Sequence, residues 1–420
     1  MFNVNITFEM RYPVDVHFVD GIPDLVAYYL RLLSDITPTL LSLLYLLCTG
    51  SVFFDVVHHM LHRCNKSSRP LFRRLARVHH YHHLYFTRHM NFDGRYLQQN
   101  RFQALPLELA LQIVGSTLGY LFASYMTPNG LVWCTRNQLL SIIGFETLRS
   151  TFVILTCGRD SNHLIYKTAP KDTNWILVGP EFHALHHVYP DRYMSSFIKV
   201  FDWIWGTAYS FRRKRFTITK GSGAFTQGII KDLEREEGVA CIRKLTIGTD
   251  WDHHDFDKVI PTLSNTDVLI LAHAYDGEDA LGSNCDSATR FIKLFKQCRA
   301  TRPACQTLPE VWYIGREIDF HPFWRNARPQ RDSQSKRRTF LPHARSCFDD
   351  PDIIYRHIVL PSFLSSVGNA VFSADWAARC AMWWIRRGAR YIPVTYTGIA
   401  WLDYFKFMYR IPYATDADQM

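Results

Sequence analysis

The sequence predicts two folds in one chain: an all-α helical bundle in a membrane over residues 1–215, and an α/β doubly wound domain over residues 216–420. Two features lead to this prediction. The first half contains long apolar segments together with 13 of the 19 histidines. The second half alternates short β-rich runs with amphipathic stretches, as a parallel sheet covered by helices requires. A basic run at residues 212–215 marks the expected boundary.

Three apolar segments of the first half are long enough, at about 20 residues each, to cross a bilayer. They are residues 36–57, 104–126 and 138–157. The second and third segments contain Glu108, Glu146 and Arg149, so a buried helix of a soluble protein is the alternative for each. Two crossings separate the early histidines from the late ones, and an even number of crossings returns the chain to the same side of the membrane.

The formal net charge of +10 comes largely from basic clusters beside apolar segments. Such clusters favour the cytosolic face of an anionic membrane, and without a base-reading motif we expect no nucleic-acid partner. Ten cysteines without a CxxC pair suit a reducing compartment. We expect no cleavable signal peptide, because the first 24 residues are polar and contain Pro13 and Pro23.

Histidines form three clusters with helical spacing: an HxxxH at 58–62, an HxxHH within 79–83, and a second HxxHH at 183–187. Side chains three or four residues apart share one face of a helix, so each cluster can present two imidazoles to one site. Imidazole suits iron, and this many rings can hold two metal ions. The alternative is histidines satisfied in a core or on a wet surface. The candidate ligands are His58, His62, His79, His80, His82, His83, His163, His183, His186 and His187.

Carboxylates near these clusters are candidates for orienting the ligand rings through their second nitrogen atoms. A solvated surface role is the alternative for each of them. They are Asp55, Asp160, Glu181, Asp191 and Asp202.

The second half carries a glycine turn at residues 219–225, between a predicted strand and a predicted helix. Glycines at such a turn allow close approach of a pyrophosphate to a helix N-terminus, which makes Gly221 and Gly223 candidates for cofactor binding. The candidate strands are 216–219, 240–245, 267–273, 311–314 and 357–360, and the candidate helices are 225–236, 285–299 and 373–387.

From Asp55 to Thr207 the chain resembles the fatty acid hydroxylase/sterol desaturase superfamily of membrane di-iron enzymes, most closely at 179–183 and 202–207. The resemblance implies two iron ions per chain, a cytochrome b5-type electron donor, and O2-dependent hydroxylation or desaturation of a lipophilic metabolite, a sterol or a fatty-acid-like substrate. Lys66 and Ala76 replace two histidines of the family pattern. The histidine boxes therefore persist in a register shifted by one helical turn, which keeps the same helical face.

Residues 216–400 resemble the short-chain dehydrogenase fold, which implies a possible NADP site. Lys220 and Thr226 stand where that family has glycine, and Asp332 stands in place of its tyrosine. An ionised carboxylate donates no proton, so the dehydrogenase domain is expected to be vestigial. Lys336 remains a candidate for binding a ribose, with a surface lysine as the alternative.

The order of the two halves resembles the bifunctional sterol desaturase/short-chain dehydrogenase proteins of filamentous fungi. We therefore expect a multi-pass protein of the endoplasmic reticulum membrane, with the histidines and the C-terminal domain in the cytosol. A catalytically impaired membrane scaffold of a biosynthetic pathway and an NADP-dependent reductase are the alternative functions.

Overall fold

The computed structural model describes residues 22–414 except 66, 127–133, 159, 253–254, 273–284, 301–306, 321–339 and 362–371. The chain divides into two compact units. One consists of residues 1–54 and 108–152, and the other of residues 55–107 and 153–420. The boundary that the sequence predicts at residue 215 falls inside the second unit, so the division into 1–215 and 216–420 stays a prediction.

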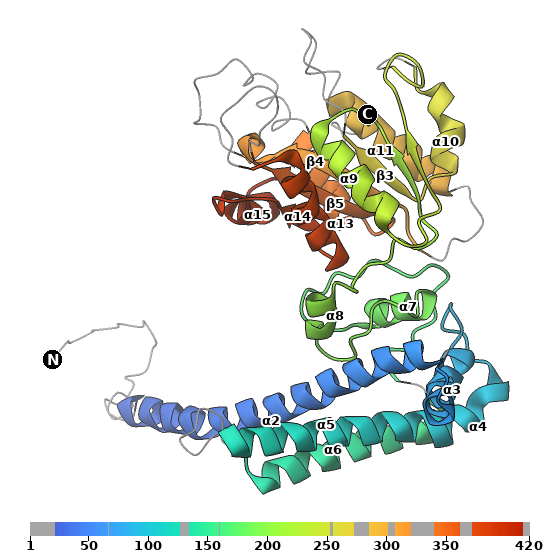
Figure 1. Ribbon diagram of the computed structural model, residues 1–420. Coiled ribbons are helices and arrows are strands. Elements are labelled where there is room, and N and C mark those ends of the chain that lie inside the picture. The colour runs from blue at the N-terminus through green and yellow to red at the C-terminus, as the bar shows by residue number, and fades with distance from the viewer. Residues whose placement is uncertain are drawn as a thin grey trace, which may run out of the picture. The chain divides into compact units, whose positions relative to one another are not determined.

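The first unit is built from three long helices that run alongside one another (Figure 1). They are α2 (Ile22–Cys64), which continues into the second unit, α5 (Leu105–Met126) and α6 (Arg136–Leu155). By length and composition, Ile36–Cys64, Gly94–Met126 and Arg136–Leu155 can each cross a membrane. Their large apolar side chains are widely exposed, as expected of helices that face lipid. The predicted membrane association is thereby supported.

Small residues bring α2 and α5 into close contact. A Cβ atom added at Gly115 would lie 2.6 Å from the Cβ of Phe53 and 2.9 Å from the Cα of Gly50. The hydroxyl of Ser116 donates to the carbonyl of Leu46 at 3.0 Å. Small residues at such a crossing let two backbones approach closely in a membrane, where packing rather than the hydrophobic effect drives association.

Two ionisable residues in the middle of α6, Glu146 and Arg149, are paired with each other. Glu146 is buried, and Arg149 lies 2.9 Å from it and donates to Gln112 of α5 at 2.8 Å. Ionisable groups in a membrane helix are expected to face protein partners in this way.

In the second unit, short helices surround the end of α2. They are α3 (Pro70–Tyr85), the 3-10 turn η1 (Gly94–Tyr96), α4 (Leu97–Gln99), the π-helical turn η2 (Asn100–Ala104), α7 (Pro180–Val188) and α8 (Val200–Trp205). Both α3 and α7 begin with proline, a residue that suits the first turn of a helix because the N–H group it lacks would have no partner there.

The rest of the second unit is a parallel six-stranded sheet with the order β2-β1-β3-β4-β5-β6. Its strands are β1 (Arg215–Ile218), β2 (Cys241–Lys244), β3 (Val268–Leu271), β4 (Glu310–Arg316), β5 (Ile354–Leu360) and β6 (Tyr391–Pro393). The order reverses between β1 and β3, which is the switch point of a doubly wound, Rossmann-like sheet. The predicted α/β domain is confirmed.

Helices cover both faces of this sheet (Figure 1). On one face α9 (Ala224–Arg235) packs against α14 (Ala374–Arg386), and on the other lie α10 (Ile260–Ser264), α11 (Ser287–Ala300), α13 (Leu341–Asp349) and α15 (Ile399–Tyr409). The 3-10 turns are η3 (Asp257–Val259) and η5 (Glu317–Phe320). The central strand β3 is wholly apolar and buried, and β5 is buried along almost its whole length, as strands covered on both faces require, whereas the edge strand β2 is mostly exposed.

The five predicted strands and three predicted helices all match observed elements. The sequence reasoning missed β6, α10, α13 and α15. Of these, β6 spans three residues and α10 five, which is too short for a periodic pattern to be recognised.

Candidate metal centre

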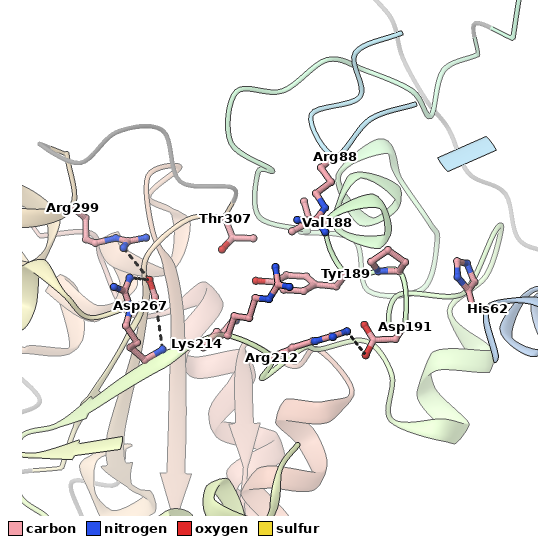
Figure 2. A pocket seen from close by; sticks show the side chains of 13 residues that line it. His62, Arg88, Val188, Tyr189, Asp191, Arg212, Lys214, Asp267, Arg299 and Thr307 are labelled. Carbon is pink, nitrogen blue, oxygen red and sulfur yellow. Dashed lines mark hydrogen bonds and ion pairs between the residues drawn. The ribbon is translucent and has the colours of Figure 1, made fainter. Parts of the chain in front are cut away.

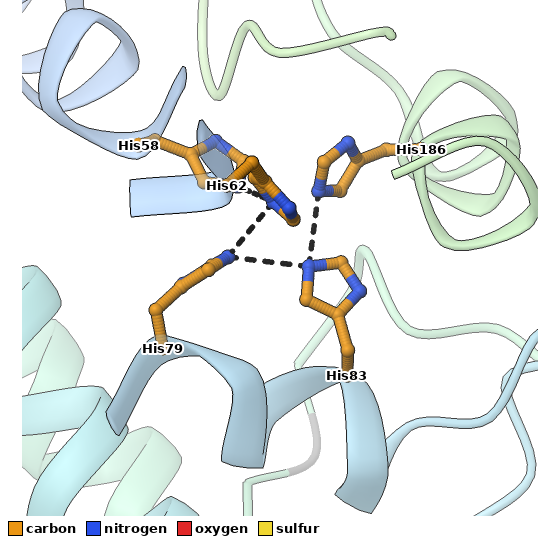
Figure 3. A group of neighbouring side chains, drawn as sticks. All are labelled: His58, His62, His79, His83 and His186. Atoms are coloured by element: carbon orange, nitrogen blue, oxygen red, sulfur yellow. Dashed lines mark hydrogen bonds between the residues drawn. The ribbon is translucent and has the colours of Figure 1, made fainter. Parts of the chain in front are cut away.

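Five histidines from three helices form the first group (Figure 3). Their ligand nitrogen atoms all lie within 4.8 Å of one another. The Nε2 atom of His62 lies 3.1 Å from those of His58 and His79, and the Nε2 atom of His83 lies 3.2 Å from those of His79 and His186. The two rings on α2 and the two on α3 are each four residues apart, so one helical face supplies both.

Four histidines form the second group. His163 comes from the loop before α7, and its Nε2 atom lies 3.3 Å from that of His82 on α3 and 3.0 Å from that of His183. The Nε2 atoms of His183 and His187, four residues apart on α7, are 3.3 Å apart. Helices α3 and α7 thus contribute to both groups, whereas α2 serves only the first and the loop only the second.

Backbone carbonyls fix the orientation of three of these rings. The Nδ1 atom of His58 lies 3.1 Å from the carbonyl oxygen of Met194, that of His186 lies 2.9 Å from Arg192, and that of His187 lies 3.0 Å from Phe86. A carbonyl oxygen only accepts, so each Nδ1 donates its proton. In a neutral ring, Nε2 then carries a lone pair directed into the group.

The directions of these Nε2 lone pairs show whether the residues fit a metal ion. In the second group, His163 donates from Nδ1 to Asp160 at 2.6 Å and His187 donates from Nδ1 to Phe86. When both rings are neutral, their Nε2 atoms carry lone pairs and no protons, and both face His183. The neutral ring of His183 has at most one proton on Nε2, so it cannot donate a hydrogen bond to both His163 and His187. A cation among the converging nitrogen atoms resolves this conflict, so the residues fit a metal ion.

Burial keeps these rings neutral. It lowers the pKa of His79, His82, His83, His183 and His187 well below the usual value, with further lowering from neighbouring histidines. Burial also lowers the pKa of His186, to about 4. Only the neutral ring binds a metal, so at neutral pH these rings are ready to act as ligands.

Three of the candidate carboxylates support the groups. Burial acts to raise the pKa of Asp160, but its hydrogen bond and charge attraction with His163, together with the backbone N–H of Asn162, hold the pKa below the usual range. Asp202 accepts from the backbone N–H groups of Met194 and Ser195 at 3.0 and 2.7 Å, and Asp55 accepts from that of Ser196 at 2.9 Å. Asp55 and Asp202 therefore hold the loop whose Met194 carbonyl orients His58.

The other two carboxylates contact no ligand ring. Asp191 lies 3.9 Å from Arg212, and Glu181 sits in the first turn of α7, where a negative charge is favourable.

Nine of the ten candidate ligands are brought together, and His80 is not among them. His80 is exposed and belongs to neither group. Successive residues of an α-helix are rotated by about 100°, so a ring next to His79 points away from the site. Reasoning from sequence also missed Asn100, which is fully buried beside His82 in a π-helical turn. Such turns occur often at functional sites, but their position leaves no recognisable sequence pattern.

The glycine turn lies where the sequence predicts, after β1 at the switch point of the sheet. Gly223 is the N-cap of α9, and a Cβ atom added at Gly221 would lie 3.1 Å from the side chain of Lys244. The third cofactor candidate, Lys336, lies outside the described residues, as do Asp332 and Lys66.

The fold and the histidine groups together define a membrane-associated protein with a candidate two-metal centre and a Rossmann-like sheet. No family model matches the chain. It is 27% identical over 255 residues to the monoglucosyldiacylglycerol epimerase of Synechocystis sp., an alignment that covers 54% of this chain and 60% of that protein. The chain thus spans less than two thirds of this relative's length.

Two solved structures share a weak likeness with this one. A short-chain dehydrogenase from Burkholderia cenocepacia in complex with NADP aligns with a TM-score of 0.37 and 11% identity, over 48% of this chain and 96% of the other. Pen from Bacillus thuringiensis aligns with a TM-score of 0.28 and 13% identity, over 36% and 51% of the two chains. The Rossmann-like character of the sheet rests on its own strand order.

Proposed function

We propose that this protein is a membrane oxidoreductase that holds two iron ions in its histidine groups and uses O2 to hydroxylate or desaturate a lipophilic substrate. The observation that carries the proposal is the convergence of nine imidazoles into two adjacent groups. Iron, when bound, supplies the activation of dioxygen. The residues of the chain hold the metal ions, orient the ligand rings and keep bulk water from the site.

The number and type of ligands favour iron over zinc. Structural zinc sites are closed by four tetrahedral ligands, usually with cysteine among them. The first group offers five imidazole nitrogens, and neither group contains a cysteine. Imidazole-rich sites of higher coordination suit iron.

Two further observations support a lipophilic substrate. Three helices can cross a membrane, and α2, the first of them, carries His58 and His62 near its end. The Synechocystis relative is named for an enzyme acting on a glycolipid, a monoglucosyldiacylglycerol. A site at the end of a membrane helix is accessible to substrates dissolved in the bilayer.

The test compares two neighbouring histidines on α3. Iron content of detergent-purified protein should be near two per chain in the wild type and in His80→Ala, because His80 is exposed and outside both groups. His83→Ala removes a ring of the first group and should lower the content by about one. Well-folded wild-type protein without iron, or equal iron in both variants, contradicts the proposal.

We further propose that the protein is a multi-pass protein of the endoplasmic reticulum, reduced by a cytochrome b5-type donor, with the histidine groups and the sheet in the cytosol. Cys241 on β2 is exposed, so a membrane-impermeant maleimide should label it in sealed microsomes without detergent. Cys241→Ser serves as the control. Labelling at this position only after detergent is added contradicts the orientation.

A second candidate function is an NADP-dependent reductase or epimerase acting through the sheet. It is favoured by Lys244, whose side-chain carbons lie next to Gly221, so that a lysine stands beside the turn where a dinucleotide phosphate would lie. NADPH titration of the full chain should then show binding that Lys244→Ala weakens. Arg243→Ala is the matched control, since Arg243 donates instead to Thr262 at 2.8 Å. Absence of NADPH binding contradicts this function.

A further inference from the structure

A cavity of about 470 Å³ lies between the end of α7 and the start of β1, within the second unit. Figure 2 shows His62 and Asp191 at one end of the view and Arg299 with Asp267 at the other. Two of the lining residues are acidic, Asp191 and Asp267, and six are cationic: Arg88, Arg212, Arg213, Lys214, Arg215 and Arg299. The cavity therefore carries a strong excess of positive charge.

The pairing of these groups leaves cations available to a ligand. Asp267 is shared, accepting from Arg215 at 2.7 Å and from Arg299 at 3.0 Å. Within the described part of the chain, Arg88 and Arg213 form no ion pair and are exposed. Guanidinium groups bind phosphate oxygens with two parallel hydrogen bonds, which makes such a cluster a suitable receptor for a polyanion.

This cavity is distinct from the glycine turn. The basic run leads into β1, whose first residue is Arg215, and Asp267 precedes β3, so both lie at the amino ends of parallel strands. Gly221 and Gly223 follow β1 and lie at the opposite, carboxyl edge. A dinucleotide bound at the switch point would leave the cavity free.

The cavity adjoins the candidate metal centre instead. His62, a ring of the first group, forms part of its wall, and the lining continues through Val188, Tyr189 and Asp191, directly after the histidines of α7. An anion held here would therefore lie next to the first histidine group. We propose that the cavity binds a phosphate or pyrophosphate group carried by the substrate, so that the substrate is a phosphorylated amphiphile. The link to the substrate rests on the proposed function, whereas anion binding does not.

The test is calorimetric titration of inorganic pyrophosphate into the full chain in a neutral detergent. Arg88→Gln and Arg213→Gln should each weaken binding about tenfold, because each removes a charged hydrogen-bond donor. Arg213→Lys should retain more affinity than Arg213→Gln. The control is Arg243→Gln, an exposed arginine on β2 outside the cavity, which should bind as the wild type does. No binding by the wild type, or equal binding by the cavity variants, overturns the proposal.

Iron measured in the same samples separates this proposal from the proposed function. Wild type stripped of iron by a chelator should bind pyrophosphate as the iron-loaded protein does, which shows that the anion is held by the cavity and not by iron. Wild type that is purified without iron and still binds pyrophosphate contradicts the metal centre alone, and iron-loaded wild type that does not bind contradicts the cavity alone.

Competition identifies the source of the phosphate. Displacement of pyrophosphate by dihexanoyl phosphatidic acid supports a lipid headgroup. Displacement by a soluble sugar phosphate but not by this lipid supports a water-soluble phosphate ester, and overturns the amphiphilic substrate.

Discussion

Acidification of the metal-free protein from pH 7.5 to 5.5 is expected to unfold the part that carries the histidine groups. Six rings outside the membrane segments have a pKa lowered by burial, in one case to about 4: His79, His82, His83, His183, His186 and His187. In the unfolded chain the same rings titrate near about 6.5. As the pH falls below that value, the unfolded chain binds protons that the folded state does not, so stability is lost.

The magnitude follows from the number of rings. A ring that stays neutral when folded costs about 1.4 kcal/mol at pH 5.5 relative to pH 7.5. Six such rings cost roughly 8 kcal/mol, which is comparable with the whole stability of a typical domain, about 5–15 kcal/mol. Bound metal should oppose this loss, because protons and metal compete for the same nitrogen atoms.

The assay is chemical denaturation of chelator-treated protein in detergent at several pH values between 7.5 and 5.5. Unfolding is monitored by circular dichroism. The free energy of unfolding should fall steeply below pH 6.5, and less steeply after iron is added. His83→Ala should reduce the pH dependence by about one sixth, whereas His80→Ala should leave it unchanged. A free energy of unfolding that is constant over this pH range refutes the reasoning.

Three further predictions concern single side chains. Asp160→Asn should weaken metal binding roughly 10- to 100-fold in competition with a chelator, because the carboxylate orients His163. Gly115→Val should cost about 1–3 kcal/mol in detergent unfolding, because its Cβ overlaps α2, while Gly144→Ala, which has open space, should not. Glu310→Gln should cost about 3–5 kcal/mol in chemical denaturation, because it leaves two buried cations without their carboxylate; an unchanged midpoint contradicts that account.

Much of the fold follows from local patterns in the sequence. The apolar segments predict α2, α5 and α6 because the length and the apolar composition of a segment together decide whether it can cross a bilayer. The alternation of apolar runs and amphipathic stretches predicts a parallel sheet, because strands buried on both faces must be apolar throughout. The helical spacing of the histidines predicts pairs such as His79 with His83, since this pairing depends only on residues one turn apart.

Only the tertiary structure decides how those rings are divided between the two groups. His82 and His83 are neighbours in sequence but belong to different groups, because each meets a partner more than 80 residues away. His82 meets His163, and His83 meets His186. The exclusion of His80 depends likewise on which face of α3 meets α7. The carbonyls that orient the rings and the basic cavity beside them come from segments distant in sequence. The sequence by itself therefore determined that these histidines can act as ligands, and the packing of distant segments decided which of them act together.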